Sequence, residues 1–191
     1  MFKLILLALL VIVAPIAMAQ TNSPDQAKNS KVSALPEGLK LEKATNPVIM
    51  ISTQRGDMVL ELFPDSAPKH VESMLNLIKK GFYNGLIFHR VIAGFVIQGG
   101  CPEGTGMGGP GYTLPAEFNK RNHLKGTLAM ARSQNPNSAG SQFYICLAPQ
   151  PHLDGSYTVF GQLRSGEDVP DKIRKGDKMN ITILQDLAPA K

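Results

Sequence analysis

Hydrophobic positions along most of this chain come in short runs separated by turn residues, a spacing that predicts strands. The runs are rich in β-branched and aliphatic residues, and they cover 48–53, 58–63, 86–91, 95–98, 126–131, 142–147, 158–163 and 178–187. The first two flank the four-residue segment 54–57, which contains Gly56 and predicts a hairpin turn. The chain therefore reads as mainly β structure.

The period of the pattern changes in two places, where helices are expected. In 68–80 the apolar residues fall at i, i+3, i+4 and i+7, namely Val71, Met74, Leu75 and Ile78. Pro68 lies in the first turn of this segment and Gly81 directly follows it, as is typical of helix ends. A second, shorter helix is predicted over 167–175, with Pro170 near its start. Because no strand–helix–strand alternation occurs, we expect an antiparallel sheet closed into a barrel, with the two helices capping it.

The amino-terminal segment has the pattern of a secretory signal peptide. Lys3 precedes an apolar stretch over 4–19, which ends in the small-residue exit Ala17-Met18-Ala19. The stretch contains Pro15 and is shorter than the roughly 20 residues that span a bilayer. We expect cleavage near Ala19, no stable membrane insertion afterwards, and a periplasmic or secreted protein. An uncleaved membrane anchor is the alternative.

Composition divides the rest of the chain in two. Residues 20–45 are polar and weakly patterned, which predicts a linker or a disordered arm. Residues 46–188 carry dense apolar runs and are the length of one domain.

Loss of the leader removes Lys3 and lowers the formal charge from +5 to +4. The basic residues are scattered, so a nucleic-acid partner is not expected.

The candidate metal ligands, thiols and nucleotide motif each fail to predict a site. The four histidines are never spaced as a metal pair, so we predict neither metal nor cofactor. The segment 104–109 matches G-x-G-x-x-G, but prolines follow it where a dinucleotide site needs a helix. Ser141 lacks the strand-to-helix elbow of a hydrolase nucleophile. Cys101 and Cys146 can be bridged or free, and we favour two free thiols because both lie in apolar or glycine-rich surroundings.

Four sequence blocks occur together in one order and spacing. They are F-H-R at 88–90, G-F-V-I-Q-G-G at 94–100, G-S-Q-F-Y-I at 140–145, and L-D-G with V-F-G at 153–155 and 159–161. Over 47–187 the chain resembles the cyclophilin family of peptidyl-prolyl cis-trans isomerases. The resemblance implies an eight-stranded antiparallel barrel with two helices and a shallow groove that binds X-Pro segments of client polypeptides.

The resemblance also implies roles for individual residues. The catalytic group comprises Arg90, Gln98 and Gln142. The substrate-binding group comprises Phe95, Val96, Ala131, Arg132, Tyr144, His152, Leu153 and Tyr157. A guanidinium is permanently protonated and planar, so Arg90 can donate to the proline nitrogen when that nitrogen loses conjugation.

Two positions depart from the family pattern. His152 stands where cyclophilins that bind cyclosporin tightly often have Trp, and the chain contains no Trp. Tyr157 stands at a position that is often His. We therefore expect weak cyclosporin binding, and we expect a monomer.

The pattern leaves two functions from different classes. The first is an isomerase that accelerates folding of exported proteins by stabilising the twisted X-Pro amide. The second is a chaperone or adhesin that holds proline-containing segments, with incidental catalysis. The guanidinium of Arg90 favours the first, because a groove that only binds has no need of it.

The signal-peptide interpretation predicts the mass of the mature protein. Intact-mass measurement on protein purified from the producing cells is expected to show a chain that begins at Gln20 or at its pyroglutamyl form. A chain that retains residues 1–19 would contradict cleavage and favour the membrane-anchored alternative.

Overall fold

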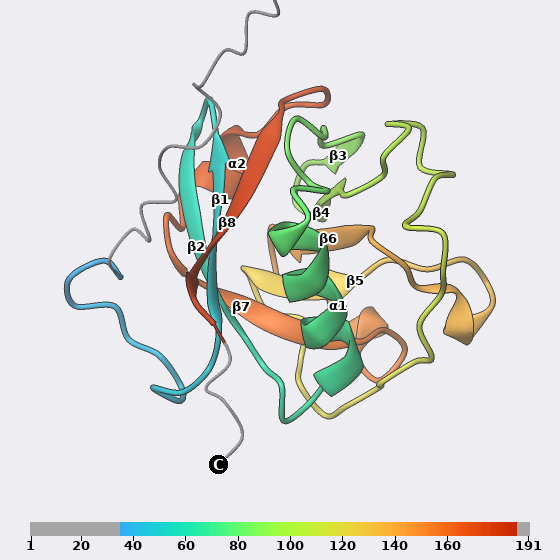
Figure 1. Ribbon diagram of the computed structural model, residues 1–191, viewed down its shortest axis with the longest axis horizontal. Coiled ribbons are helices and arrows are strands. Elements are labelled where there is room, and N and C mark those ends of the chain that lie inside the picture. The colour runs from blue at the N-terminus through green and yellow to red at the C-terminus, as the bar shows by residue number, and fades with distance from the viewer. Residues whose placement is uncertain (1–34, 187–191) are drawn as a thin grey trace, which may run out of the picture. The chain divides into compact units, whose positions relative to one another are not determined.

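The computed structural model describes residues 35–186, so the leader 1–19 and the first part of the polar arm lie outside the described residues. Figure 1 shows a curled sheet with helices packed beside it. The strands are β1 (Val48–Thr53), β2 (Gly56–Leu62), β3 (Arg90–Ile92), β4 (Val96–Gly99), β5 (Thr127–Met130), β6 (Phe143–Cys146), β7 (Val159–Ser165) and β8 (Met179–Gln185). The α-helices are α1 (Pro68–Lys79) and α2 (Val169–Lys172), and short 3-10 turns cover Pro136–Ser138 and Pro151–Leu153. None of the helices within 35–186 has the length and apolarity needed to cross a membrane.

All eight strands belong to one antiparallel sheet, in the order β3-β4-β6-β5-β7-β2-β1-β8. This confirms the mainly β prediction and the number of strands. The hairpin between β1 and β2 is tighter than predicted, because Thr53 pairs directly with Gly56 and only Gln54 and Arg55 form the turn. Gly56 has a φ of 125°, a conformation that glycine adopts without a steric penalty.

The predicted closed barrel is wrong, because the sheet is open between β3 and β8. The predicted strand over 86–91 is regular only from Arg90, at the start of β3. The backbone before it meets the start of β8 through one isolated bridge between Ile87 and Lys178 and through single bonds such as Phe88 N–H to the carbonyl of Asp177. The turns over 81–85 end the contact with β8 on the amino-terminal side, and the three-residue β3 pairs with β4 instead of β8 on the other side. The result is a curled sheet whose two edge strands do not form a ladder.

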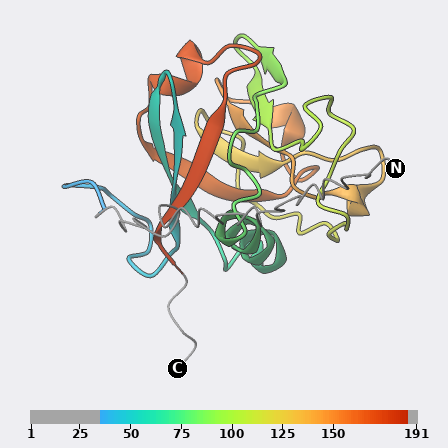
Figure 2. The ribbon, with the colours of Figure 1, turned by 45° about the horizontal axis from the view of Figure 1, so that its top comes forward.

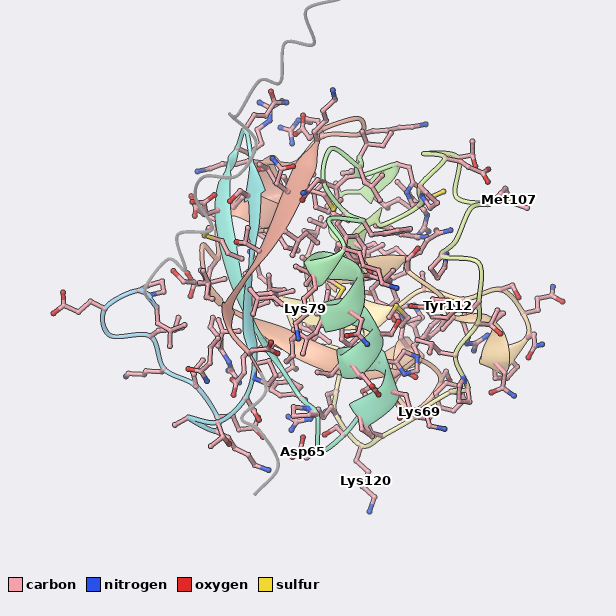
Figure 3. The ribbon with its side chains drawn as sticks, viewed as in Figure 1. Asp65, Lys69, Lys79, Met107, Tyr112 and Lys120 are labelled. Carbon is pink, nitrogen blue, oxygen red and sulfur yellow. The ribbon has the colours of Figure 1, made fainter. Side chains whose placement is uncertain are left out.

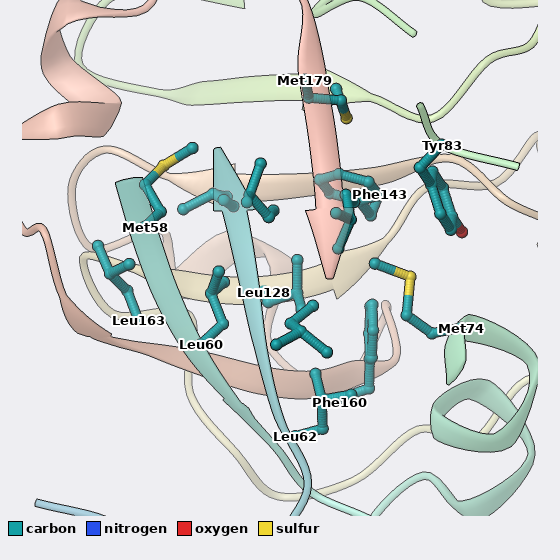
Figure 4. Packing of buried hydrophobic residues seen from close by; sticks show 14 of the residues in the cluster. Met58, Leu60, Leu62, Met74, Tyr83, Leu128, Phe143, Phe160, Leu163 and Met179 are labelled. Atoms are coloured by element: carbon teal, nitrogen blue, oxygen red, sulfur yellow. The ribbon is translucent and has the colours of Figure 1, made fainter. Parts of the chain in front are cut away.

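The main core fills the inner face of the sheet, and α1 packs against it. The predicted helical face is confirmed, since Val71, Met74, Leu75 and Ile78 are all buried. Figure 4 shows Met74 of α1 near the aromatic rings of this core. Figures 1 and 2 place α1 and α2 at different ends of the sheet.

The second helix is shorter than predicted. It ends at Lys172, because Ile173 takes extended backbone angles and buries its side chain in the core. The next residue, Arg174, donates its backbone N–H to the carboxylate of Asp177 at 2.8 Å. This bond gives the Arg174 N–H a partner outside any helix, so residues 173–175 do not form the predicted helical turn.

The predicted linker or disordered arm is described only from Leu35, and there it packs against the sheet. Three leucines, Leu35, Leu39 and Leu41, pack with a small cluster formed by Val48, Val59 and Leu184. This cluster is separate from the main core. The few leucines in this polar stretch therefore attach it to the sheet. The average polarity of the segment, on which the linker prediction was based, does not reveal this contact.

A buried carboxylate fixes this arm to the sheet. Glu61 of β2 is fully buried and accepts hydrogen bonds from four donors. The backbone N–H groups of Glu42 and Lys43 lie 3.0 and 3.1 Å from its oxygens, Asn46 Nδ2 at 2.8 Å, and Arg164 Nε at 2.7 Å. Because burial of an unpaired polar or charged group is costly, the arm and β7 together supply the partners that this buried carboxylate needs.

Removal of the Glu61 carboxylate is expected to lower the free energy of unfolding by about 3 to 5 kcal/mol, because the Arg164 guanidinium and three further donors lose their partner. Denaturant titration of Glu61→Ala measures this loss. Glu72→Ala, at an exposed glutamate of α1, serves as the matched control and is expected to change stability by less than about 0.5 kcal/mol. Equal effects of the two substitutions would contradict the role assigned to Glu61.

Candidate active site

A groove of about 200 Å³ lies on the face of the sheet that points away from the main core. Its lining combines two guanidinium groups, a glutamine and apolar or aromatic side chains: Arg90, Phe95, Val96, Gln98, Ala131, Arg132, Tyr144, Leu153 and Tyr157. The structure thus brings together nine of the eleven residues that the sequence singled out. The other two, Gln142 and His152, lie beside the groove.

Strand alternation explains how the sequence forms this face. In β4 the side chain of Ile97 belongs to the main core, so Val96 and Gln98 face the groove. In β6 the same alternation sends Tyr144 to the groove and its neighbours Phe143 and Ile145 to the core. The register pairs Arg90 with Gln98 and Gln98 with Tyr144, which sets these three residues in a row across β3, β4 and β6.

A chain of side-chain amides supports the Arg90 guanidinium. Arg90 Nη1 lies 3.4 Å from Gln98 Oε1, and Gln98 Nε2 donates to Gln142 Oε1 at 3.1 Å. Gln142 Nε2 donates in turn to the carbonyls of Gly106 and Gly108 at 2.8 and 2.9 Å. Because a guanidinium only donates, every amide in the chain has a fixed orientation. The guanidinium is thereby oriented by backbone carbonyls two side chains away.

Arg90 itself stays exposed to solvent, with its Cζ 5.5 Å from the centroid of the Phe95 ring. Its charge therefore sits at the rim of an apolar cavity without being buried in it. A cation in this position retains most of its hydration and stacks on an aromatic face. One N–H group can then be presented to a molecule in the groove.

The second guanidinium of the groove is held in place by carbonyl groups. Arg132 Nη2 donates to the carbonyl of Ser156 at 2.8 Å, and Nη1 donates to the carbonyl of Ser133 at 2.9 Å. Its Cζ lies 4.5 Å from the centroid of the Tyr157 ring. These contacts join the 131–138 segment to the wall that carries Tyr157.

His152 and Gln142 are placed differently from the rest of the predicted set. His152 is exposed and stacks on Phe95, with ring centroids 5.8 Å apart and planes at 22°, so it lies at the rim behind that ring. Gln142 lies in an adjoining hollow of about 440 Å³, which is bordered by the glycine-rich loop 104–112. Figure 3 shows Met107 and Tyr112 on this loop, and Met107 is 88% exposed.

Both cysteines are free and buried, which agrees with the favoured expectation. Burial raises the pKa of the Cys146 thiol to about 12. Burial also raises the pKa of Cys101, but hydrogen bonds from loop N–H groups, Gly106 first, outweigh this effect and leave that pKa below its usual value. The Gly106 N–H lies 3.2 Å from Cys101 Sγ, so the thiol helps to hold the loop that binds Gln142.

Two residues behind the groove were missed by the sequence reasoning. His123 is buried and contacts Tyr144, and Asp154 accepts hydrogen bonds from His123. Asp154 stands in the L-D-G block but was assigned no role, and no spacing pattern identifies His123, which lies 21 residues from Tyr144 and 31 from Asp154. Among residues 35–186, no three His, Cys, Asp or Glu side chains gather as a metal site.

Comparisons with known proteins agree with this fold and groove. The family model described as cyclophilin type peptidyl-prolyl cis-trans isomerase matches residues 48–187. A peptidyl-prolyl cis-trans isomerase of Synechococcus elongatus is 49% identical over 142 residues, covering 73% of this chain and 97% of the relative. A peptidyl-prolyl cis-trans isomerase of Helicobacter pylori is 49% identical over 147 residues, covering 75% and 90%.

A solved structure leads to the same family. A cyclophilin-type isomerase of Cryptosporidium parvum, crystallised in the presence of the dipeptide Ala-Pro, superimposes with a TM-score of 0.66 at 34% identity. The match covers 71% of this chain and 98% of that one. The chain belongs to the cyclophilin family, and it is a peptidyl-prolyl cis-trans isomerase.

Proposed function

We propose that this isomerase accelerates the folding of exported proteins, and that its groove stabilises the twisted X-Pro amide of a client chain. The observation that carries the proposal is the exposed Arg90 guanidinium, aligned through Gln98 at the rim of an apolar cavity. The leader pattern in the sequence supports a site of action in the periplasm or outside the cell, after cleavage near Ala19.

The chemistry needs neither a nucleophile nor a metal. An X-Pro amide resists rotation because its C–N bond has partial double-bond character, with a barrier of about 18 to 20 kcal/mol. When the bond twists, the proline nitrogen loses conjugation and its lone pair becomes a hydrogen-bond acceptor. An N–H of Arg90 directed at that nitrogen interacts more strongly with the twisted state than with the planar one, which is the requirement for catalysis.

The apolar walls supply the second part of the rate increase. Val96, Tyr144 and Leu153 surround the position where a prolyl ring would be held while the preceding carbonyl turns. They also exclude water, which strengthens the bond from the guanidinium. Ala131, Arg132 and Tyr157 line the part of the groove that we assign to the residue before proline.

The magnitudes require both parts. Uncatalysed exchange takes about 10 s or longer, so exchange in about 1 ms needs a factor of roughly 10⁴, or about 5.4 kcal/mol. One charge-assisted hydrogen bond contributes only about 1.5 to 3 kcal/mol net. Desolvation and fixing of the prolyl ring must therefore supply the remainder.

The same groove accounts for the expected weak cyclosporin binding. His152 packs behind Phe95 at the rim, where an imidazole presents less apolar surface than an indole. A monomer suffices for this function, since every residue assigned to the groove comes from one chain.

Arg90→Ala is expected to lower kcat/KM for an X-Pro peptide by at least about 10²-fold, equivalent to about 2.7 kcal/mol of transition-state stabilisation. The Tm is expected to stay nearly unchanged, because the side chain is exposed. A protease-coupled isomerisation assay and a thermal melt measure the two quantities. Arg174→Ala, at an exposed arginine outside the groove, serves as the control and is expected to keep full activity. Full activity of Arg90→Ala, or a loss that only follows unfolding, would contradict the assignment.

His152→Trp is expected to tighten cyclosporin binding by about 1 to 3 kcal/mol, because an indole adds apolar surface and an N–H donor at the rim. Titration calorimetry of both proteins measures the difference. Equal affinities would show that position 152 does not contact this ligand.

A further inference from the structure

Directly behind the groove, a buried histidine joins two of its walls. His123 is only 1% exposed and does not line the groove. Its Nε2 lies 3.0 Å from the hydroxyl oxygen of Tyr144, and its Nδ1 lies 2.9 Å from Asp154 Oδ1. The backbone N–H of His123 donates to the same carboxylate oxygen at 2.7 Å. The imidazole is therefore held at both nitrogens.

The protons along this chain have a defined order. The backbone and side-chain hydrogen bonds from His123 lower the pKa of Asp154, so its carboxylate is ionised and can only accept. Nδ1 of His123 must then carry a hydrogen. With that hydrogen on Nδ1, Nε2 can accept the hydroxyl hydrogen of Tyr144. Burial raises the pKa of Tyr144, which keeps that hydroxyl protonated.

These bonds fix three side chains that line the groove. Tyr144 stacks on the imidazole, with ring centroids 6.0 Å apart and planes at 14°. Tyr157 meets the His123 ring edge-on at 6.5 Å and the Tyr144 ring edge-on at 5.9 Å. Leu153 directly precedes Asp154, so the carboxylate also sets the position of that wall. All three lining residues thus depend on one imidazole outside the groove.

We propose that His123 is a positioning residue of the isomerase, which acts through Tyr144 and Asp154 to set the width of the groove and hence the affinity for the prolyl ring. The proposal rests on the function assigned above to the groove. The walls that His123 positions contact a prolyl ring in the planar and in the twisted state alike, so a small displacement of them weakens both states equally. Phe95 and Val96, which His123 does not contact, continue to shield the Arg90 hydrogen bond from water. Such uniform loss of binding raises KM and leaves kcat unchanged.

The test separates KM from kcat in His123→Phe, which keeps an aromatic ring but removes both nitrogens. Rates are measured over a range of X-Pro peptide concentrations. We expect KM to rise about tenfold and kcat to stay within about twofold. His123→Gln keeps a donor and an acceptor, and it is expected to restore KM to within about threefold of the original protein.

His70→Phe is the matched control, because it removes another buried imidazole that has a carboxylate partner. His70 is fully buried on α1, and its Nδ1 lies 2.6 Å from Glu117 Oε2, with no part in the groove lining. Its substitution is expected to lower Tm but to leave KM unchanged. An equal rise of KM in both phenylalanine variants would show that general loosening, and not positioning, is responsible.

Three further outcomes would overturn the proposal: an unchanged KM in His123→Phe, a fall in kcat without a change in KM, or no rescue by glutamine. If His123→Phe does not fold, Asp154→Ala tests the same link from its other end, where the side chain is 30% exposed. It too is expected to raise KM, and an unchanged KM would overturn the proposal. Failure of the function proposed above would give a different result, because Arg90→Ala would then keep full activity.

Discussion

The orientation of one exposed guanidinium is the constraint on which the groove depends. A free arginine side chain loses up to about 2 kcal/mol of rotamer entropy when it is fixed, so an exposed Arg90 needs a partner that orients it in advance. Gln98 is that partner, and Gln142 in turn fixes Gln98 to the carbonyls of Gly106 and Gly108. Slippage of β4 by one residue would send Gln98 into the core and disconnect the guanidinium from the loop.

Two carboxylate networks support the fold on either side of this arrangement, one around the fully buried Glu61 and one around the partly exposed Asp154. Glu61 collects donors from the 42–46 segment and from Arg164, so it joins the arm to β2 and β7. Asp154 and His123 play the corresponding part behind the groove, where they join the Tyr144 ring to the turn that carries Leu153. In both networks the buried polar atoms that hold the segments together have partners, as low dielectric surroundings require.

The sequence predicted those parts of the fold whose pattern is local. The helix α1 follows from the period of its apolar residues, and the hairpin β1–β2 follows from the turn residues between two apolar runs. The closed barrel and the full-length second helix failed because contacts with distant segments decide them. The pairing of Ile87 with Lys178 and the burial of Ile173 have no local signal.

The candidate site divides in the same way. Sequence blocks identified Arg90 and the lining residues, and the structure brings nine of them into one groove. His152 was expected in the lining, but it stacks on the outside of Phe95. His123 escaped prediction because its partners are far away in the chain, and a buried histidine carries no pattern of its own.

The central claim is that a planar, oriented guanidinium stabilises the twisted amide, which a charge alone would do less well. Arg90→Lys tests it most directly, because lysine keeps the charge but loses the fork that Gln98 orients. Exchange between the cis and trans forms of an X-Pro peptide can be measured by NMR without a coupling protease. The account predicts that the lysine variant loses at least about tenfold in catalysed exchange, while peptide binding persists. Exchange as fast as in the original protein would contradict it.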